Sequence, residues 1–451
     1  MKRTMILIAA LLYSAGGCST PDAAKAREKT SVPTKDAFTK SAKDSGKVQD
    51  DWLATFKDPA LPALVREAQA NNPDLTVASG RLDEARARAT KAGAALSPQI
   101  SAGVSGSAGD PGARSTATSQ ANLGLNIAWE VDVWGRLRQG QAAATQDALA
   151  AAADFEFARQ SLASQTAEAW FLAIAAKRQV ALDAEVVGIY DKTMQITAAR
   201  KKEGVASQMD VDLAAGNLAN ARQALTRSEG AREEAIRSLE VLLGRYPAAE
   251  VDVAAQLPPM PGQIPTGMPS ELLERRPDVI AADRQVAAAF FRKGSAKAAK
   301  LPTFAISGSL GAMLNPAAAI WSIGGNLLAP IVDGGARQAD VEIAEGQQKQ
   351  ALGNYVRTAL NGFKEVETAL ANEAVLAGRE QELATAADRY TKARISAEVS
   401  YKEGAMTLVD LNSIQSQDSS TRIELLKVQS ERLRQRLKLH LALGGSFEAA
   451  R

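Results

Sequence analysis

The sequence contains few of the residues from which most active sites and metal centres are built. One histidine and one cysteine among 451 residues leave little material for zinc sites, disulfide frameworks or cysteine–histidine catalysis. A formal net charge of +2 gives no electrostatic reason to expect nucleic-acid binding. The one histidine, His440, stands beside Leu441 in the last helical stretch, where we expect a structural role.

A long apolar segment is also missing after the first residues. Residues 2–3 are basic, residues 5–12 are apolar and residues 14–17 are small. This pattern is typical of a secretory signal peptide and is too short to span a bilayer as a helix. We therefore predict that residues 1–17 are a signal peptide. No stretch of about twenty apolar residues follows, so no transmembrane helix is expected in the mature chain.

The only cysteine, Cys18, stands where cleavage would expose it. The segment resembles the lipobox of bacterial lipoproteins, although Ala15 stands where leucine is usual. The resemblance implies a covalent lipid at Cys18, and Ser19 resembles the sorting position of outer membrane lipoproteins. Ordinary signal cleavage with an incidental thiol is the alternative. Residues 18–50, with almost no large apolar side chains, are expected to form a lipid-anchored flexible tether.

The second half of the chain repeats the first. Six local patterns recur after 200 to 204 residues by subtraction of their residue numbers, and such agreement predicts an internal duplication. The two repeats are expected at 51–246 and 270–447, joined by a proline-rich linker at 247–269. The recurring patterns are Asn72-Pro73-Asp74 with Arg276-Pro277-Asp278, Pro98 with Pro302, Asp132 with Asp333, Lys202-Glu203-Gly204 with Lys402-Glu403-Gly404, Asp210 with Asp410, and Leu243-Gly244 with Leu443-Gly444.

Each repeat carries one predicted β-hairpin, at about 98–133 and about 302–333. Apolar side chains occupy every odd position from 123 to 133, and polar or small ones occupy the even positions. Strict alternation predicts a strand with one apolar face. Strands of roughly ten residues cross a bilayer when tilted. A half-buried sheet of a soluble protein is an alternative that the strands alone leave open.

Helices complete the predicted repeat. Asn72-Pro73-Asp74 has the cap, the first-turn proline and the acidic residue of a helix start. Helical patterns then run over about 135–202 and 335–402, which corresponds to rods of roughly 100 Å at 1.5 Å per residue. Returning helices are expected at about 206–243 and 406–443, after turns at Gly204 and Gly404. Two hairpins cannot close a transmembrane barrel, so several chains must pool their strands. The helical hairpins could continue that barrel as a coiled-coil tube.

The motifs now described resemble the outer membrane efflux proteins of the TolC superfamily, in particular the NodT/OprM-type lipoproteins of tripartite resistance-nodulation-division (RND) systems. The resemblance covers about residues 50 to 447. It is carried by Trp52, Phe56, Asp58 and Leu61, by Asn72 to Leu75, by Trp129 to Arg136, by Leu272 to Val279, by Pro330 to Gly335, by Phe363 to Leu370 and by Leu441 to Gly445.

The resemblance implies a mainly α-helical fold with transmembrane β-strands. It implies a homotrimer with a 12-stranded β-barrel, four strands per chain, continued by a long α-helical coiled-coil barrel. It further implies a passive exit duct in the cell outer membrane that extends into the periplasm. The implied partners are a periplasmic adaptor, also called membrane fusion protein, an inner-membrane RND pump and outer membrane lipid. The cargo would be small toxic compounds, and no cofactor is implied beyond the lipid at Cys18.

Two sites follow from the resemblance residue by residue. The turns match the periplasmic tips at which family members meet the adaptor, although glycine would make the turn in any case. Val409 and Asp410 match positions that narrow the tunnel entrance, with a solvated charge near a helix start as the alternative. Ser413 stands where some relatives have a second carboxylate. The predicted docking residues are Lys202, Glu203, Gly204, Val205, Lys402, Glu403, Gly404 and Ala405.

Three other functions fit the sequence less well. An outer membrane duct for type I protein secretion is disfavoured by the lipoprotein-like start. A pore-less periplasmic coiled-coil scaffold has no use for four strands of bilayer length. An enzyme has least support: Glu130 and Asp132 are expected on the lumen side of a strand, but no base, nucleophile or metal cluster accompanies them.

Overall fold

The computed structural model describes residues 32–39, 48, 50–109, 118–262, 264–314 and 317–447. The predicted signal peptide, Cys18 and most of the predicted tether lie outside these residues. The chain forms two compact units. Among the described residues, the first unit contains Ser79–Phe155 and Asp278–Leu360. The second contains Thr34–Ala78, Glu156–Pro277 and Asn361–Arg451.

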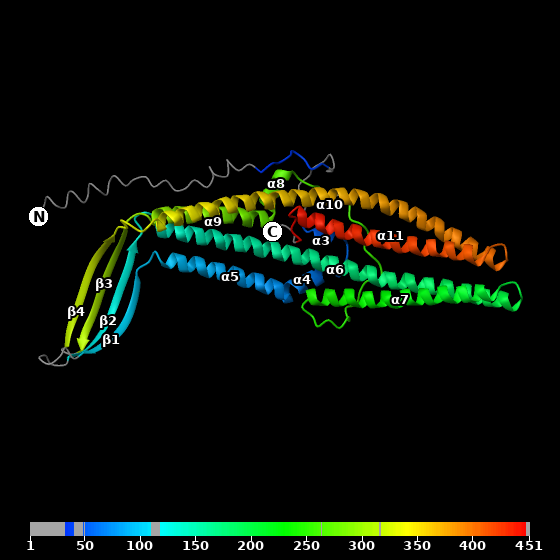
Figure 1. The fold of residues 1–451 in the computed structure, drawn as a ribbon, viewed down its shortest axis with the longest axis horizontal. Coiled ribbons are helices and arrows are strands. Elements are labelled where there is room, and N and C mark those ends of the chain that lie inside the picture. Colours follow the sequence, from blue (N-terminus) through cyan, green and yellow to red (C-terminus); the bar gives the residue numbers. More distant parts are fainter. Residues whose placement is uncertain are drawn as a thin grey trace. The chain divides into compact units, whose positions relative to one another are not determined.

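Apart from an additional four-residue helix, Trp52–Thr55, at the start of the first half, the described elements occur in the same order in both halves of the chain (Figure 1). Each half has a short helix, a 22-residue helix, a β-hairpin, a helix of 67 residues and a returning helix of 35 residues. The short helices α3, α4 and α8 were not predicted from the sequence. The elements are α3 (Trp52–Thr55), α4 (Leu61–Asn71), α5 (Pro73–Ala94), β1 (Gln99–Gly109), β2 (Thr118–Val131), α6 (Arg136–Lys202) and α7 (Gln208–Leu242), then α8 (Pro269–Arg275), α9 (Pro277–Ala298), β3 (Thr303–Leu314), β4 (Ala317–Leu328), α10 (Ala336–Lys402) and α11 (Leu408–Ala442).

The first unit contains a four-stranded antiparallel sheet in the order β1-β2-β3-β4. Residues opposite each other in a ladder share a face. Leu125 lies opposite Leu310, which lies opposite Trp321, so the apolar side chains of both repeats form one face. Asn126 and Ser309 are paired in the same way on the polar face. The chain is thus mainly α-helical with one antiparallel sheet, and the expected fold class is confirmed.

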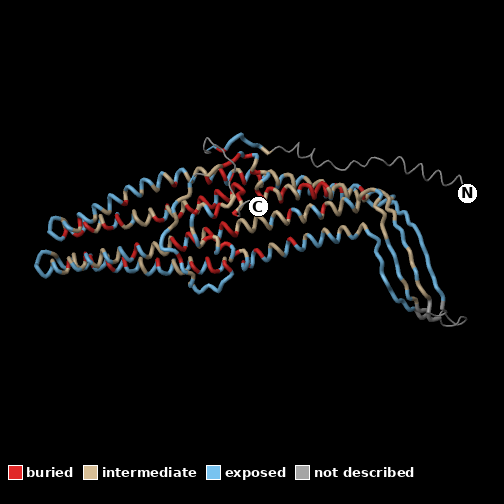
Figure 2. Tube along the Cα trace, turned by 180° about the vertical axis from the view of Figure 1, so that it is seen from behind, coloured by how far each residue is buried: buried red, intermediate tan, exposed pale blue. Residues whose placement is uncertain are grey.

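Most strand residues are exposed in the single chain (Figure 2), and they include the large apolar ones. Trp321 and Ile323 are each 75% exposed, and Leu310 is 60% exposed. Large apolar side chains gathered on one exposed face mark a surface that meets another molecule or a membrane. Of the helices in the described part of the chain, none is long and apolar enough to cross a membrane.

Two aspartates begin the long helices of the first unit. The Asp132 carboxylate accepts hydrogen bonds from the backbone N–H groups of Leu137 and Arg138, at 3.1 and 2.9 Å. Burial alone would raise the Asp132 pKa, but these N–H donors and the Arg138 guanidinium hold it below its usual value. Asp333 accepts from Gly335 and Arg337 at the start of α10. The prediction that Asp132 lies on a strand was wrong, because β2 ends at Val131 and the next polar side chain caps a helix.

The core of the second unit joins α3 to the long helices. The His440 ring stacks on Trp52, with centroids 5.6 Å apart, and Phe56 packs against Phe171 at 5.3 Å. The Trp170 indole N–H donates to Asp58 at 2.8 Å. His440 is 2% exposed, and burial together with the nearby Arg436 cation lowers its pKa to about 3. The early aromatic residues are therefore core residues, and His440 is a neutral packing residue.

Asn72 and Arg276 hold the ends of the returning helices. Asn72 caps α5, since its side-chain oxygen accepts from the N–H of Asp74 at 2.8 Å. Its NH₂ group also donates to the carbonyl of Leu242 at the end of α7, at 3.0 Å. Arg276 occupies the matching place in the second repeat and donates to the carbonyl of Ala442 at 3.1 Å. Both residues satisfy carbonyls that a helix end leaves without partners.

Candidate functional site

The two helical hairpins of the second unit end in turns of the same geometry. Gly204 and Gly404 have φ angles of 77° and 85°. In the first turn the N–H of Val205 donates to the carbonyl of Arg200 at 2.9 Å, and Ala405 repeats this bond in the second. This is the Schellman arrangement, in which a residue with positive φ reverses the chain after a helix. Glycine is required here because a side chain at positive φ is strained.

Both returning helices start with a capped turn. The Ser207 hydroxyl accepts from the N–H of Asp210 at 3.1 Å, and the Asp210 carboxylate accepts from the Ser207 N–H at 2.9 Å. Backbone and hydroxyl donors of Ser207 lower the Asp210 pKa. Thr407 and Asp410 form the corresponding cap in the second repeat, where the Thr407 hydroxyl donates to Asp410 at 2.7 Å. Asp410 therefore has a local structural role that it shares with Asp210.

The structure places the predicted tip residues together on the surface. All eight predicted docking residues are exposed, four at each turn. Val409 is 64% exposed on the first turn of α11, and Asp410 beside it is also exposed. Cys18 lies outside the described residues. The tips thus present glycine turns flanked by lysine, glutamate and small apolar side chains.

An apolar cluster lies directly beneath the tips. Leu408 and Leu411 of α11 pack with Ala397 and Tyr401 of α10 and with Ala214 of α7. Leu408 is buried although its neighbour Val409 is exposed. The cluster therefore fixes which face of α11 points outward at the tip, and it brings helices from both repeats together.

Hydrogen bonds centred on Tyr401 join the two repeats in the same region. The Tyr401 hydroxyl lies 2.8 Å from the Thr197 hydroxyl of α6, and both side chains are buried. The Arg200 guanidinium donates to the carbonyl of Tyr401 and lies 4.8 Å from its ring centroid. Further along, the Gln415 amide donates to the Thr193 hydroxyl at 2.9 Å. These contacts set the position of α10 and α11 relative to α6.

A buried ion pair lies one layer deeper. Asp418 is 1% exposed and accepts from Thr391 at 2.6 Å and from the Arg394 guanidinium at 2.8 Å. A buried carboxylate is stable only with such partners. This pair and the Tyr401 contacts were not predicted. The sequence contains one signal for the Tyr401 contacts. The first repeat has Lys201 at the position where the second repeat has Tyr401, although the Lys-Glu-Gly pattern that follows is the same in both.

Comparison with known proteins identifies the family. The family model described as "Outer membrane efflux protein" matches residues 64–245 and 268–445. The chain belongs to this family. Its sequence is 28% identical to the cation efflux system protein CusC of Escherichia coli O6:H1 over 413 residues, with 88% of each chain covered. It is 29% identical to the outer membrane protein OprJ of Pseudomonas aeruginosa over 479 residues, covering 100% of this chain and 98% of the relative.

The fold agrees with the sequence match. The structure of the outer-membrane channel OprN superposes with a TM-score of 0.85 at 26% identity, covering 92% of this chain and 98% of the channel. The resemblance seen in the sequence motifs is confirmed, and the protein is an efflux channel protein of the outer membrane. The two turns and the capped starts of α7 and α11 are thus features of an efflux protein.

Proposed function

We propose that the protein is the exit duct of a tripartite efflux pump and carries small toxic compounds across the outer membrane without changing them. The amphipathic sheet carries this proposal. Its apolar face is exposed and its polar face continues across all four strands. A membrane-spanning wall around a water-filled path needs such a sheet, with apolar residues toward lipid and polar residues inside.

The proposed duct is a homotrimer. Within the described residues of a single chain, β1 and β4 each have only one neighbouring strand, so one edge of each is left unpaired. Unpaired backbone groups are costly in lipid, and pairing β1 of one copy with β4 of the next removes both edges. Three chains of four strands each would close a barrel of twelve strands. The helical hairpins, 67 and 35 residues long in each repeat, would continue the path into the periplasm.

The proposed adaptor contact is the set of eight exposed tip residues, Lys202 to Val205 and Lys402 to Ala405. The backbone is open at Gly204, where nothing lies within 4 Å of a Cβ built on the residue, whereas at Gly404 the Arg200 guanidinium lies 3.8 Å from such an atom. A partner helix hairpin could approach that backbone closely. The lysine and glutamate beside each glycine would supply polar contacts at the rim of the interface.

The proposed entrance constriction is formed by Val409 and Asp410 of three chains. Asp410 follows the second turn by six residues and is exposed. Three such carboxylates about 6 Å apart would repel by about 3 kcal/mol per pair at an effective dielectric constant of 20, which favours bound cations or partial protonation. The capping bond to Thr407 holds the carboxylate in place and limits how far it can turn away.

The proposed anchor is a lipid on Cys18, which would hold the chain in the outer membrane beside the strands. In this proposal the protein binds and transports compounds and catalyses no reaction itself. A periplasmic adaptor and an inner-membrane pump driven by protons would supply cargo and energy. Mass spectrometry of the mature chain would detect diacylglycerol on the cysteine sulfur. An unmodified cysteine would show that no lipid anchors the chain at this residue.

Imaging of single particles extracted with mild detergent tests the duct. A hollow particle with three-fold symmetry and a length well over 100 Å supports it, since the helical hairpins alone have roughly that length. A solid rod, or a monomer released from membranes without detergent, would instead support the scaffold. Export of a polypeptide in place of small molecules would favour the type I secretion duct.

Docking is tested by charge placement at the tips. Val205→Asp and Ala405→Asp should each weaken adaptor binding by about tenfold, because a desolvated carboxylate meets no partner in the interface. Tyr246→Asp is the matched control, since Tyr246 is 86% exposed and lies after α7, away from the tips. Equal losses of adaptor binding in all three variants would show that the tips are not the docking site.

A further inference from the structure

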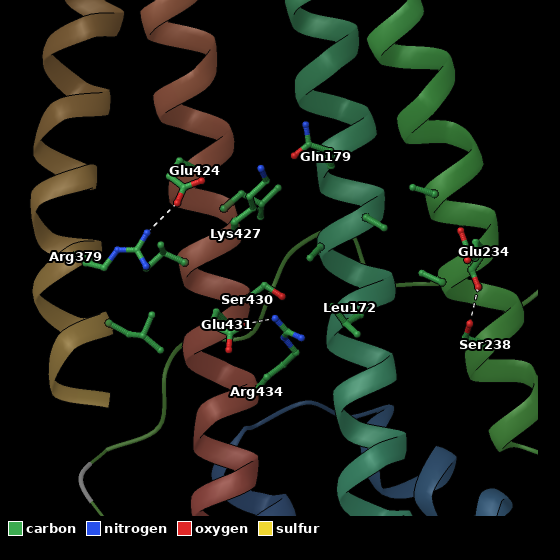
Figure 3. Close-up of a pocket in the computed structure, with 17 residues that line it drawn as sticks. Leu172, Gln179, Glu234, Ser238, Arg379, Glu424, Lys427, Ser430, Glu431 and Arg434 are labelled. Carbon is green, nitrogen blue, oxygen red and sulfur yellow. Dashed lines mark hydrogen bonds and ion pairs between the residues drawn. The ribbon is translucent and has the colours of Figure 1, made fainter. Parts of the chain in front are cut away.

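A groove in the second unit lies between the helical hairpins of the two repeats (Figure 3). It has a volume of about 690 Å³, within the range of small-molecule sites. Its apolar surface includes Leu172, Ala175, Ala176, Ala231, Ala235 and Leu376 from α6, α7 and α10, together with Leu426 and Val428 of α11. Leu172 is exposed although it is surrounded by helices, because it faces this space.

The groove opens on a different side of α6 from the aromatic core. Phe171 contacts Phe56, whereas Leu172, Ala176 and Gln179 follow each other at helical spacing on another face. The apolar surface of the groove is therefore separate from the packing that holds α3 in place. The groove-lining side chains are thus not part of the aromatic core of the unit.

Two hydrogen-bond donors at the groove lack partners. Ser430 is 4% exposed, lines the groove, and its hydroxyl has no partner among the described residues. Ser419 and Ser420, on the same helix, donate to carbonyls of the preceding turn instead. Arg434, one turn further, also lines the groove and has a buried Nε–H without a partner in the described chain. A buried donor without an acceptor is costly, so a site that supplies one is favoured.

A free ammonium group stands beside these donors. Lys427 lies three residues before Ser430 on the same face of α11, and it forms no hydrogen bond or ion pair with the residues that the structure describes. Two of the other basic groups are neutralised, since Arg379 pairs with Glu424 at 2.9 Å and Arg434 pairs with Glu431, while Glu234 of α7 adds a further carboxylate to the lining. Figure 3 shows Lys427 and Ser430 projecting from α11 toward α6.

We propose that this groove binds a small amphipathic acid, with its carboxylate on Lys427, Ser430 and Arg434 and its apolar body on the leucine and alanine surface. Lys427 and Arg434 are donors only and the Ser430 hydroxyl can donate, so together they match an acceptor-only anion better than an ammonium ligand. The proposal rests on the proposed function in one respect, which is that such an acid would be cargo of the duct. Binding itself does not depend on transport.

A fluorescent fatty acid tests the site. Full-length protein in lipid nanodiscs is titrated with dansyl-labelled undecanoic acid and, separately, with its neutral methyl ester, and empty nanodiscs give the blank. We expect saturable binding of the acid that is about tenfold tighter than that of the ester, because charge-assisted hydrogen bonds are lost in the ester. Lys427→Gln should weaken the acid about tenfold and leave the ester unchanged. Leu172→Trp should reduce both by filling the groove.

Two controls separate the site from general effects. Lys364→Gln removes an exposed lysine of α10 that does not line the groove and that makes no hydrogen bond or ion pair within the described part of the chain. Its binding of the acid should equal that of the unmodified protein. Equal loss in Lys427→Gln and Lys364→Gln, or equal affinity for acid and ester, would overturn the proposal.

Ser430→Ala distinguishes a ligand contact from a packing defect. If the hydroxyl binds the acid, the variant loses affinity several-fold for the acid alone. If it is only an unpaired group, thermal stability rises with unchanged affinity, and the head-group assignment is wrong.

Three-fold hollow particles without acid binding would refute the proposed acid site in the groove and leave the proposed duct standing. Acid binding by chains that form no duct would refute the duct and leave the groove.

Discussion

Replacing Asp410 by alanine should raise the conductance of the channel, whereas the same change at Asp210 should not. Both carboxylates make the same local bond, to the hydroxyl of Thr407 at 2.7 Å and of Ser207 at 2.8 Å. Only Asp410 is proposed to lie at the entrance constriction. Asp210 is therefore an internal control for every effect of the helix cap.

The expected magnitudes differ for stability and for ion flow. Loss of the cap bond should lower the free energy of unfolding by about 0.5–1 kcal/mol in both variants. At the entrance, three carboxylates about 6 Å apart repel by about 3 kcal/mol per pair at an effective dielectric constant of 20. Cations held there would also be released. Asp410→Ala should therefore widen the entrance and reduce the preference for cations, most clearly at low salt where screening is weak.

Planar bilayer recordings at low and high salt measure both properties. Asp410→Asn adds a useful comparison, because its amide oxygen can still accept from Thr407 while the charge is gone. We expect the highest conductance for Asp410→Ala and the next highest for Asp410→Asn. The unmodified protein and Asp210→Ala should have equal, lower conductance. If Asp210→Ala and Asp410→Ala change conductance alike, or neither does, the constriction lies elsewhere and Asp410 is only a cap.

Two further predictions concern the second unit. The pKa of His440 is lowered to about 3, so the folded chain keeps the imidazole neutral, whereas the unfolded chain protonates it below about pH 6.5. The contribution of His440 to the free energy of unfolding is therefore fully present above about pH 6.5. It falls by about 1.4 kcal/mol per pH unit and chain as the solution is acidified toward pH 3. His440→Leu should flatten this slope in denaturant titrations between pH 6 and 4, and an unchanged slope would assign it to other groups. Tyr401→Phe and Thr197→Val should each cost about 1 kcal/mol, and the double variant should show coupling of about 0.5–1.5 kcal/mol, since the hydroxyls bond each other at 2.8 Å. Additive losses would mean that the bond does not form.

Local chemistry made the tips predictable from the sequence. Gly204 and Gly404 adopt positive φ because no other residue reverses the chain after a helix so easily. Asn72 was predicted as a cap, and its side-chain oxygen bonds the N–H of Asp74. Each of these features depends on residues a few positions apart, and so a short pattern was enough to find them.

Contacts between distant segments were not predictable in the same way. The bond from Asn72 to the carbonyl of Leu242 joins residues 170 positions apart, and Tyr401 meets Thr197 across the two repeats. Both follow from how the helices pack, which a single sequence does not specify. Asp132 was misplaced for a related reason: alternation continues past the last strand residue, and only the helix start at Arg136 shows that the carboxylate is a cap.

Release of a small dye from sealed vesicles tests the central claim most directly. Vesicles containing the purified full-length chain are loaded with a small fluorescent dye and with a labelled dextran too large for the path, without any pump or energy source. A passive duct predicts that the dye leaves while the dextran stays, with faster release by Asp410→Ala if the entrance is narrow at rest. Retention of the dye by both the unmodified protein and Asp410→Ala would contradict the account.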